Sequence, residues 1–336
     1  MEKIYQVLRV PSRICSRLGS LVVAAAIMSL LSPARIYGQA KESAGRKHEM
    51  IFSRLVSKHE PETKAAEKWD QAMPTGNGRV GALVFGNIQN EAIILNHDSL
   101  FFTTKKPTIP DMSEHLPKLR QLIAQGRYEE AGRYYKDQAK AKYDFQGSDS
   151  YHPAFNVTID MPMTGKITDI YRIVDFETGE VSVTWKQADV TYRRNVFVSR
   201  KDDVVVISIG ASRPGMVNCK VGLLPTGLKR CELGDGKNVR VHRFPMGRVA
   251  KIRLEEVPIT FNLSADENRL ALVGKYDIGG KYNLAGGDEY GGCARVVVKG
   301  GSAKTSDLQV VAERANEILV LIKLFANKES AAALPM

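Results

Sequence analysis

The stretch WDQAMPTGNGRVGALVFGNIQNEAIILNHDSLFF, residues 69–102, decides the fold. Within it Gly76, Gly78 and Gly81 lie between Pro74 and the apolar run ALVFG, which is typical of a β-strand. Glycine permits positive φ and a close approach of two backbones. We therefore expect a tight turn at these glycines that leads directly into a strand.

The same three glycines spell G-x-G-x-x-G, the fingerprint of a dinucleotide-binding turn. Such a site needs a strand before the glycines and a helix after them, because the helix N-terminus holds the pyrophosphate. Here residues 65–74 are polar and end in a proline, and residues 82–86 suit a strand. This context is the inverse of a nucleotide site, and we expect no cofactor-binding residue.

After residue 150 the chain consists of short strand-like runs separated by turns. Val181, Val183 and Trp185 alternate with polar residues, and the runs at 196–199 and 204–209 flank a turn-prone Lys-Asp-Asp. Many short strands at this spacing predict a large sandwich or barrel, not a βαβ fold. Earlier in the chain we expect strands at 81–88 and 92–95 with a turn at 89–91. Later we expect strands at 217–224, 239–241, 252–254, 259–263, 270–273, 294–298 and 318–325, a turn at 234–236 and a glycine-rich loop at 274–292.

Residues 113–140 interrupt the β pattern with two helical stretches separated by Gly126. Ser113 is placed to cap the first stretch. Tyr134 and Tyr135 on the second stretch have two interpretations. They could form a platform on which a sugar stacks, or they could pack the helices onto a sheet, and the second interpretation is favoured.

The N-terminal segment, residues 1–40, is typical of a secretory signal peptide. Three arginines precede an apolar run at 18–31, and small residues follow at 38–40. The run is shorter than the roughly 20 residues that span a bilayer as a helix, so an uncleaved anchor is less favoured. We expect a secreted or periplasmic protein with no membrane span after cleavage. Residues 41–64 are polar without a sustained period and predict a linker.

Charge and cysteine content narrow the functional classes. The formal net charge is +11, of which residues 1–40 contribute +4, and no basic run with interleaved aromatic residues occurs. A solvated basic surface is therefore favoured over nucleic-acid binding. Beyond the signal, Cys219, Cys231 and Cys293 remain, an odd number whose spacing fits no zinc site. Cys219 and Cys231 could pair across a hairpin, or the cysteines could be buried thiols.

Residues 69–102 resemble the opening motif of glycoside hydrolase family 95, the α-L-fucosidase and α-L-galactosidase family. That motif commonly reads W-x-x-A-L-P-x-G-N-G-x-L-G-A-M-V-F-G and continues with L-N-E-D-T-L-W. The chain departs from it at His97, where the family usually has Glu, and at Phe101, where it has Trp. The matching residues are Trp69, Ala72, Pro74, Gly76, Asn77, Gly78, Arg79, Gly81, Ala82, Val84, Phe85, Gly86, Glu91, Leu95, Asn96, Asp98 and Leu100.

The resemblance extends over residues 65–325. Residues 169–176 are similar to the family's Y-x-R-x-L-D-L element, and residues 192–199 are similar to its next signature. It implies an N-terminal β-supersandwich at 65–326, similar to the galactose-mutarotase-like fold, followed by a tail at 327–336. We expect its motif residues to be structural: Trp69, Pro74, Gly76, Asn77, Gly78, Arg79, Gly81, Asn96, Asp98, Arg172, Asp175 and Arg194.

In family 95 the chemistry belongs to an (α/α)₆ barrel that follows the sandwich. Inverting glycoside hydrolysis needs an acid and a base on opposite sides of the sugar. We expect this chain to lack that barrel, to contain no catalytic residue and to be inactive alone. In a full enzyme, which would act on a fucosylated or galactosylated glycan, it would dock on the barrel. A secreted carbohydrate- or partner-binding module and a mutarotase-like enzyme are the alternatives.

Individual polar residues favour structural roles as well. Arg172 and Asp175 would form an ion pair or cap a turn, and His97 with Asp98, and His152, would pack or form hydrogen bonds. Close carboxylates are common on turns and solvated edges, so they imply no active site without a pocket. The acidic candidates are Asp175, Glu177, Glu180, Asp202, Asp203, Asp288 and Glu289.

Overall fold

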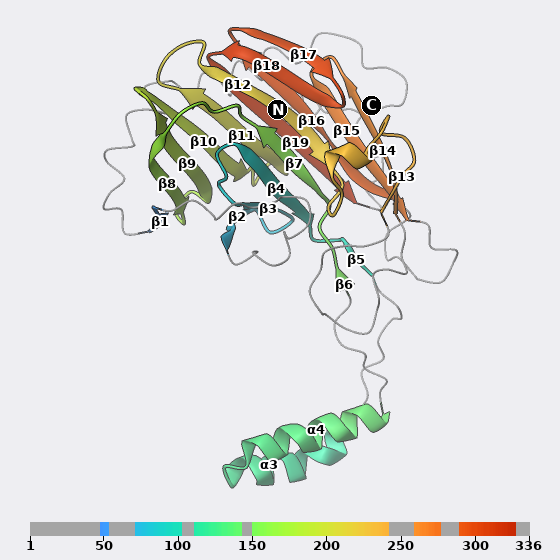
Figure 1. Ribbon diagram of the computed structural model, residues 1–336. Helices are drawn as coiled ribbons and strands as arrows, with labels where there is room; N and C mark the ends of the chain where they lie inside the picture. The colour runs from blue at the N-terminus through green and yellow to red at the C-terminus, as the bar shows by residue number, and fades with distance from the viewer. Residues whose placement is uncertain are drawn as a thin grey trace.

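The computed structural model describes residues 48–53, 71–102, 111–142, 150–241, 259–276 and 289–326. Two large antiparallel sheets face each other in it (Figure 1), which confirms the predicted β-sandwich with a short helical insertion. The elements are β1 (Glu49–Phe52), β2 (Met73–Gly76), β3 (Val80–Val84), β4 (Asn90–His97), β5 (Phe101–Phe102), η4 (Ser113–His115), α3 (Leu116–Ala124), α4 (Tyr128–Lys142), β6 (Ser150–Tyr151), β7 (Phe155–Asp160), β8 (Ile167–Asp175), β9 (Glu180–Gln187), β10 (Val190–Val198), β11 (Val204–Ala211), β12 (Val217–Leu224), η5 (Arg230–Glu232), β13 (Val239–Val241), β14 (Ile259–Asp266), β15 (Arg269–Tyr276), β16 (Glu289–Lys299), β17 (Ser302–Ser306), β18 (Gln309–Ala315) and β19 (Glu317–Ala326).

The larger sheet has ten strands in the order β1-β8-β9-β10-β11-β19-β16-β15-β14-β13. Strand β9 shows why these residues form it. Val181, Val183 and Trp185 are fully buried, as their predicted alternation requires, and Trp185 stacks on Tyr192 of β10 with the ring centroids 5.4 Å apart. Each such buried side chain contributes about 1.5–3 kcal/mol to folding. The β9–β10 hairpin therefore supplies part of the core between the two sheets.

The smaller sheet has seven strands in the order β17-β18-β12-β7-β4-β3-β2. Its β2–β3 hairpin is the predicted glycine turn: Gly76 pairs with Gly81, and Gly78 has a φ of 95°. Pro74 lies inside β2, so the end of the expected polar lead at 65–74 is a strand; residues 65–70 lie outside the described part of the chain. Because β2 is the last strand of this sheet, its proline removes no ladder hydrogen bond from a central strand.

The helices α3 and α4 form a hairpin around Gly126 that lies away from both sheets in Figure 1. The predicted cap at Ser113 is wrong, because Ser113 begins the short helix η4 and the residue that precedes α3 is His115. Tyr134 does not pack onto a sheet, since its Oη lies 3.0 Å from His115 Nδ1 inside the hairpin. Tyr135 is 48% exposed.

Several boundaries differ from the sequence prediction for identifiable reasons. Residues Glu49–Phe52, inside the predicted linker, form edge strand β1 on β8. Strand β4 already begins at Asn90, so two of the three residues of the predicted turn at 89–91 belong to the strand and only Gln89 precedes it. Gly291 belongs to β16, not to a loop, because a Cβ there would come 2.1 Å from Leu272 O of β15. Gly274 and Gly292 likewise lie in strands β15 and β16.

Some expectations concern residues outside the described ones: the signal peptide, most of the linker, Trp69, the strand at 252–254, Asp288 and the tail. Cys219, Cys231 and Cys293 are all free thiols, so the Cys219–Cys231 pairing is wrong. Burial raises the pKa of the Cys219 thiol to about 12 and of the Cys293 thiol to about 11. In the described part of the chain, none of the helices combines the length and apolarity needed to cross a membrane.

Candidate functional site

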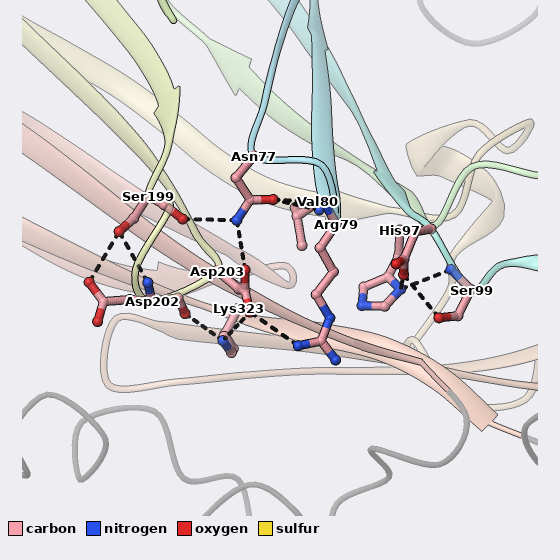
Figure 2. Close-up of polar contacts among 10 residues, drawn as sticks. Asn77, Arg79, Val80, His97, Ser99, Ser199, Asp202, Asp203 and Lys323 are labelled. Atoms are coloured by element: carbon pink, nitrogen blue, oxygen red, sulfur yellow. Dashed lines mark hydrogen bonds and ion pairs between the residues drawn. The ribbon is translucent and has the colours of Figure 1, made fainter. Parts of the chain in front are cut away.

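A polar network joins the two sheets at the turn that carries the glycines (Figure 2). Asn77 Nδ2 donates to Asp203 Oδ1 at 2.6 Å and to Ser199 O at 2.9 Å. Arg79 Nη1 donates to Asp203 Oδ2 at 3.2 Å, and Lys323 Nζ lies 4.0 Å from the same oxygen. We call Asn77, Arg79, Ser199, Asp203 and Lys323 the turn network. It connects the β2–β3 turn of the smaller sheet to the β10–β11 turn and β19 of the larger one.

Asn77 also shapes its own turn. Its Oδ1 accepts hydrogen bonds from Arg79 N at 3.0 Å and Val80 N at 2.9 Å, and Asn77 N donates to Val80 O at 3.1 Å. Asparagine commonly satisfies the backbone of a turn in this way. One side chain therefore sets the turn with its oxygen and ties it to the opposite sheet with its nitrogen.

The charges of the turn network are partly screened by water. The exposed fractions of the side chains are 41% for Arg79, 25% for Asp203 and 20% for Lys323. Burial lowers the pKa of Lys323, and Asp203 opposes that shift. The two cations share one carboxylate, so the charged groups of the turn network pair with one another across the two sheets.

His97, at the end of β4, and Tyr151 of β6 lie beside the turn network. His97 is 2% exposed, and its Nδ1 is 3.0 Å from Asp98 Oδ1 and 3.3 Å from the N of Ser99. Tyr151 Oη donates to His97 O at 3.0 Å. Burial lowers the pKa of His97 and raises the pKa of Tyr151 to about 12. Both groups have the hydrogen-bonding role that the sequence favoured for His97.

A second connection between the sheets is an ion pair with no exposed surface. Arg194 Nη1 of β10 donates to Glu91 Oε2 of β4 at 2.7 Å, and both side chains are 0% exposed. Glu91 Oε1 also accepts from Phe85 N at 3.1 Å and Gly86 N at 3.2 Å. Arg194 also donates to Asn87 O at 2.9 Å. Burial raises the pKa of Glu91 and lowers that of Arg194, and each partner opposes the other's shift.

Arg172 makes a third connection, from β8 to the segment that carries β2 and β3. Its Nη1 donates to Phe85 O at 2.7 Å and to Gln71 O at 3.2 Å. Gly86 has a φ of 76°, and a Cβ there would lie 2.4 Å from Arg172 Cδ, so only glycine suits this position. Asp175 caps a turn instead, because its Oδ1 accepts from Glu177 N at 2.9 Å.

His152 occupies an aromatic cluster in the core. Its Nδ1 lies 2.8 Å from Pro153 O, and its Nε2 lies 2.6 Å from Tyr276 Oη. Since a carbonyl only accepts, Nδ1 carries the proton and Nε2 accepts from the tyrosine. Burial lowers the pKa of His152 to about 4, so the ring is neutral at pH 7.

The remaining predicted residues are distributed over the hairpin and its surroundings. Asn96 pairs with Gly81 across β3 and β4, and Asp98 is 52% exposed. Glu180 lies 3.5 Å from Arg193, and burial raises its pKa. Among the described residues, no group of three or more His, Cys, Asp or Glu side chains is arranged to hold a metal ion. These positions support strand pairing and do not converge on a reacting atom.

Sequence reasoning quoted Glu91 and Arg194 as motif matches but did not pair them, and it gave Lys323 no role. The two motif residues are 103 positions apart, so no local spacing connects them. A charged residue inside each of two apolar strand patterns was the available signal, because an unpaired buried charge is strongly unfavourable.

Comparisons with known proteins give a consistent assignment. The family model described as "Glycosyl hydrolase family 65, N-terminal domain" matches residues 62–330. The chain is 27% identical over 165 residues to "Alpha-L-fucosidase 2" of Arabidopsis thaliana, which covers 46% of this chain and 18% of that protein. It is 30% identical over 179 residues to "Probable alpha-fucosidase A" of Aspergillus niger, which covers 51% of this chain and 21% of that protein.

The matches thus span about a fifth of the length of these curated relatives. Among solved structures, "Putative kojibiose phosphorylase from human microbiome" aligns over 84% of this chain and 33% of its own, with 12% identity and a TM-score of 0.42. A likeness at that level supports no inference about activity.

Proposed function

The chain belongs to the glycosyl hydrolase family 65 N-terminal domain family, and on that premise we propose that it is the non-catalytic β-sandwich of an α-L-fucosidase-like enzyme of family 95. The match over residues 62–330 carries this proposal. The names of the relatives support the fucosidase part, and the family 95 part rests on the motif from Trp69 to Phe102. In a full enzyme the substrate would be a fucosylated or galactosylated glycan.

The geometry of the motif residues supports a structural role. Asn77, Arg79, Arg172 and Arg194 each connect one sheet to the other or to the segment beside it. A catalytic acid or base must instead reach a substrate proton in a cleft. The motif therefore encodes the joining of two sheets, and the catalytic residues would come from a helical barrel docked on this sandwich. We also propose export of the protein, on the pattern of residues 1–40.

The direct test is an activity assay on the purified chain. We expect no release of fucose or galactose from 4-nitrophenyl α-L-fucoside or α-L-galactoside above a preparation from an empty expression host. A purified α-L-fucosidase serves as the positive control. Release well above the background that disappears in Asp203→Asn or Glu180→Gln would show an active site inside the sandwich and would overturn the proposal.

Assembly is tested by co-expression with the part of the Aspergillus niger relative that this chain does not match. We expect the two pieces to co-purify, because the sandwich would dock on the barrel. Separate elution of two folded pieces would contradict the docking role while leaving the absence of catalysis in the sandwich intact.

A further inference from the structure

A groove of about 580 Å³ opens on the face of the smaller sheet that points away from the core. The strand register puts Asn90 of β4, Asp160 of β7 and Lys220 of β12 side by side across this face. On the same strands the alternate residues, such as Ile159 and Val221, are fully buried in the core. The groove is lined by Gln89, Asn90, Asp160, Met161, Pro162, Met163, Lys220, Arg230 and Gln309.

Arg230 forms one wall because a neighbouring residue has no side chain. It comes from helix η5 and lies over Gly222 of β12, where a Cβ would be only 2.3 Å from Arg230 Nη2. The same nitrogen donates a hydrogen bond to Thr158 Oγ1 of β7. Gly222 and Thr158 are register partners, so these two strands together hold the guanidinium at the groove.

The charged side chains among the described residues of the groove favour an anion. Lys220 and Arg230 are cationic and Asp160 is the one carboxylate in this lining; its Oδ2 accepts a 3.4 Å hydrogen bond from Gln309 Nε2. Lys220 is exposed, whereas Gln309 is 6% exposed. Arginine and lysine bind carboxylates with charge-assisted hydrogen bonds, which are about twice as strong as neutral ones.

The other residues that line the groove suit the hydroxyl groups and the carbon-bound hydrogens of a sugar. The amides of Gln89, Asn90 and Gln309 both donate and accept, as hydroxyl groups require. Met161, Pro162 and Met163 provide an apolar surface for carbon-bound hydrogens, and Met161 N donates to Gln89 O at 2.7 Å, which fixes one end of this wall. The volume lies in the usual range of small-molecule sites, roughly 300–1,000 Å³.

We propose that this groove binds an acidic saccharide of about two sugar units, with its carboxylate on Arg230 and Lys220 and its hydroxyls on Asp160, Asn90 and Gln309. The proposal goes beyond the structural role of the sandwich. Only the choice of a saccharide as the carrier of the carboxylate rests on the proposed function. The groove would let the sandwich hold a charged glycan independently of any catalytic barrel.

The test is calorimetric titration of the full chain with digalacturonate, compared with lactose as a neutral disaccharide and with acetate and sulfate as simple anions. We expect digalacturonate to bind with a dissociation constant on the order of 1 mM or tighter and the other three to bind at least about tenfold more weakly. Lys220→Gln and Arg230→Gln should each weaken binding about tenfold or more, the value of one charge-assisted hydrogen bond.

Gly222→Ala is the sharpest variant, because it preserves every charge. The added Cβ would displace the guanidinium of Arg230, and Gly222 has no positive φ that would strain the backbone. We expect weaker binding by about tenfold with a melting temperature close to that of the unmodified chain. Lys299→Gln, on β16 of the larger sheet, removes the same charge outside the groove and should leave binding unchanged.

The outcomes separate this proposal from the proposed function. The absence of a heat of binding at about 10 mM digalacturonate, well above the expected dissociation constant, would overturn the groove proposal. Equal binding of lactose would overturn it as well. Equal binding of acetate or sulfate would show that the groove is a simple anion site, and this result would also overturn the groove proposal. None of these results bears on whether the chain lacks glycosidase activity, which the hydrolysis assay decides alone.

Discussion

The Glu91–Arg194 pair and the turn network join the same two sheets, but in opposite surroundings. Glu91 and Arg194 are both 0% exposed, and their charged atoms lie 2.7 Å apart. Backbone N–H groups donate to Glu91 Oε1 and backbone carbonyls accept from the Nη atoms of Arg194, whereas Arg194 Nε has no hydrogen-bond partner among the described residues. In the turn network the carboxylate of Asp203 is shared by two cations, all of them partly in water. Water can replace a broken contact in the turn network but not in the buried pair.

This difference shows which residues of the motif determine how the two sheets pack together. Breaking a buried pair by removing one partner leaves an uncompensated charge, whereas exposed pairs contribute about 0–1 kcal/mol. The buried pair therefore determines that β4 and β10 face each other, and the turn network adjusts the ends of the hairpins. Both use residues that a sequence comparison alone could mistake for catalytic groups.

Replacing Arg194 by methionine is the most damaging change that we expect. Methionine fills similar space but leaves the Glu91 carboxylate buried without its partner, which costs about 3–5 kcal/mol of unfolding free energy. Urea denaturation measures the loss. The double variant Glu91→Gln with Arg194→Met should recover most of it, since no charge then remains buried and the glutamine oxygen can still accept from Phe85 N and Gly86 N. A loss below about 1 kcal/mol in the single variant would show that the pair behaves like a surface contact.

His152 extends the comparison to a buried group that hydrogen-bonds to the uncharged Pro153 O and Tyr276 Oη. Its pKa falls from the ordinary 6.5 to about 4, so on acidification the unfolded chain takes up a proton that the folded chain refuses. Stability that is present above pH 6.5 is therefore lost as the pH falls toward 4, by about 3 kcal/mol in total. Denaturation of the protein and of His152→Gln across this interval measures the difference, which should vanish if the ring titrates normally.

Asp203→Asn tests the turn network with little disturbance of the backbone. Asp203 has a φ of 52°, a conformation that asparagine also tolerates, so the backbone is preserved. The change removes the negative charge and replaces one of the two oxygens that accept from Asn77 and Arg79 by an NH2 group that cannot accept. We expect a loss of about 1 kcal/mol that shrinks in 1 M salt, because partly exposed pairs are screened. Thermal melts at low and high salt provide the measurement. A loss of stability that is large and independent of salt would show that the turn network behaves like the buried pair.

Gly78→Ala gives the smallest effect and isolates the backbone of the turn. Nothing lies within 4 Å of the added Cβ, but the φ of 95° is unfavourable for alanine, and we expect a cost of about 1 kcal/mol. Gly81→Ala is the matched control, because Gly81 lies in β3 with no positive φ and only ordinary contacts. Equal melting temperatures for the two variants would mean that the turn does not depend on its glycine.

The sequence predicted the strands that have a strong apolar pattern. The run from Val217 to Leu224 is strand β12 with the same bounds, and the alternation at Val181, Val183 and Trp185 gave β9. The polar strand β17 was missed, because Ala303 is the one apolar residue of Ser302–Ser306, and the strand is recognised by its pairing with β18. Short-range pattern cannot report pairing of that kind.

Long-range contacts explain why the site was harder to predict than the fold. The motif identified Asn77, Arg79 and Arg194, but their partners lie more than 100 positions away. Gly222 looked like any strand residue until η5 placed Arg230 over it. The glycines at 291 and 292 suggested a loop, although they are needed where two strands approach closely. Each miss involves a contact between two different elements that no periodic pattern reports.

The central claim is that the motif joins the two sheets through a buried ion pair, which a weaker turn network supports. A double-mutant cycle on each of these two connections tests that claim most directly. The free energies of unfolding of Glu91→Gln, Arg194→Met and their double variant give one coupling energy, and Arg79→Gln, Asp203→Asn and their double variant give the other. We predict a coupling of about 2–3 kcal/mol for the buried pair and below about 1 kcal/mol for the turn network. Equal couplings, or a larger one for Arg79 and Asp203, would contradict the account.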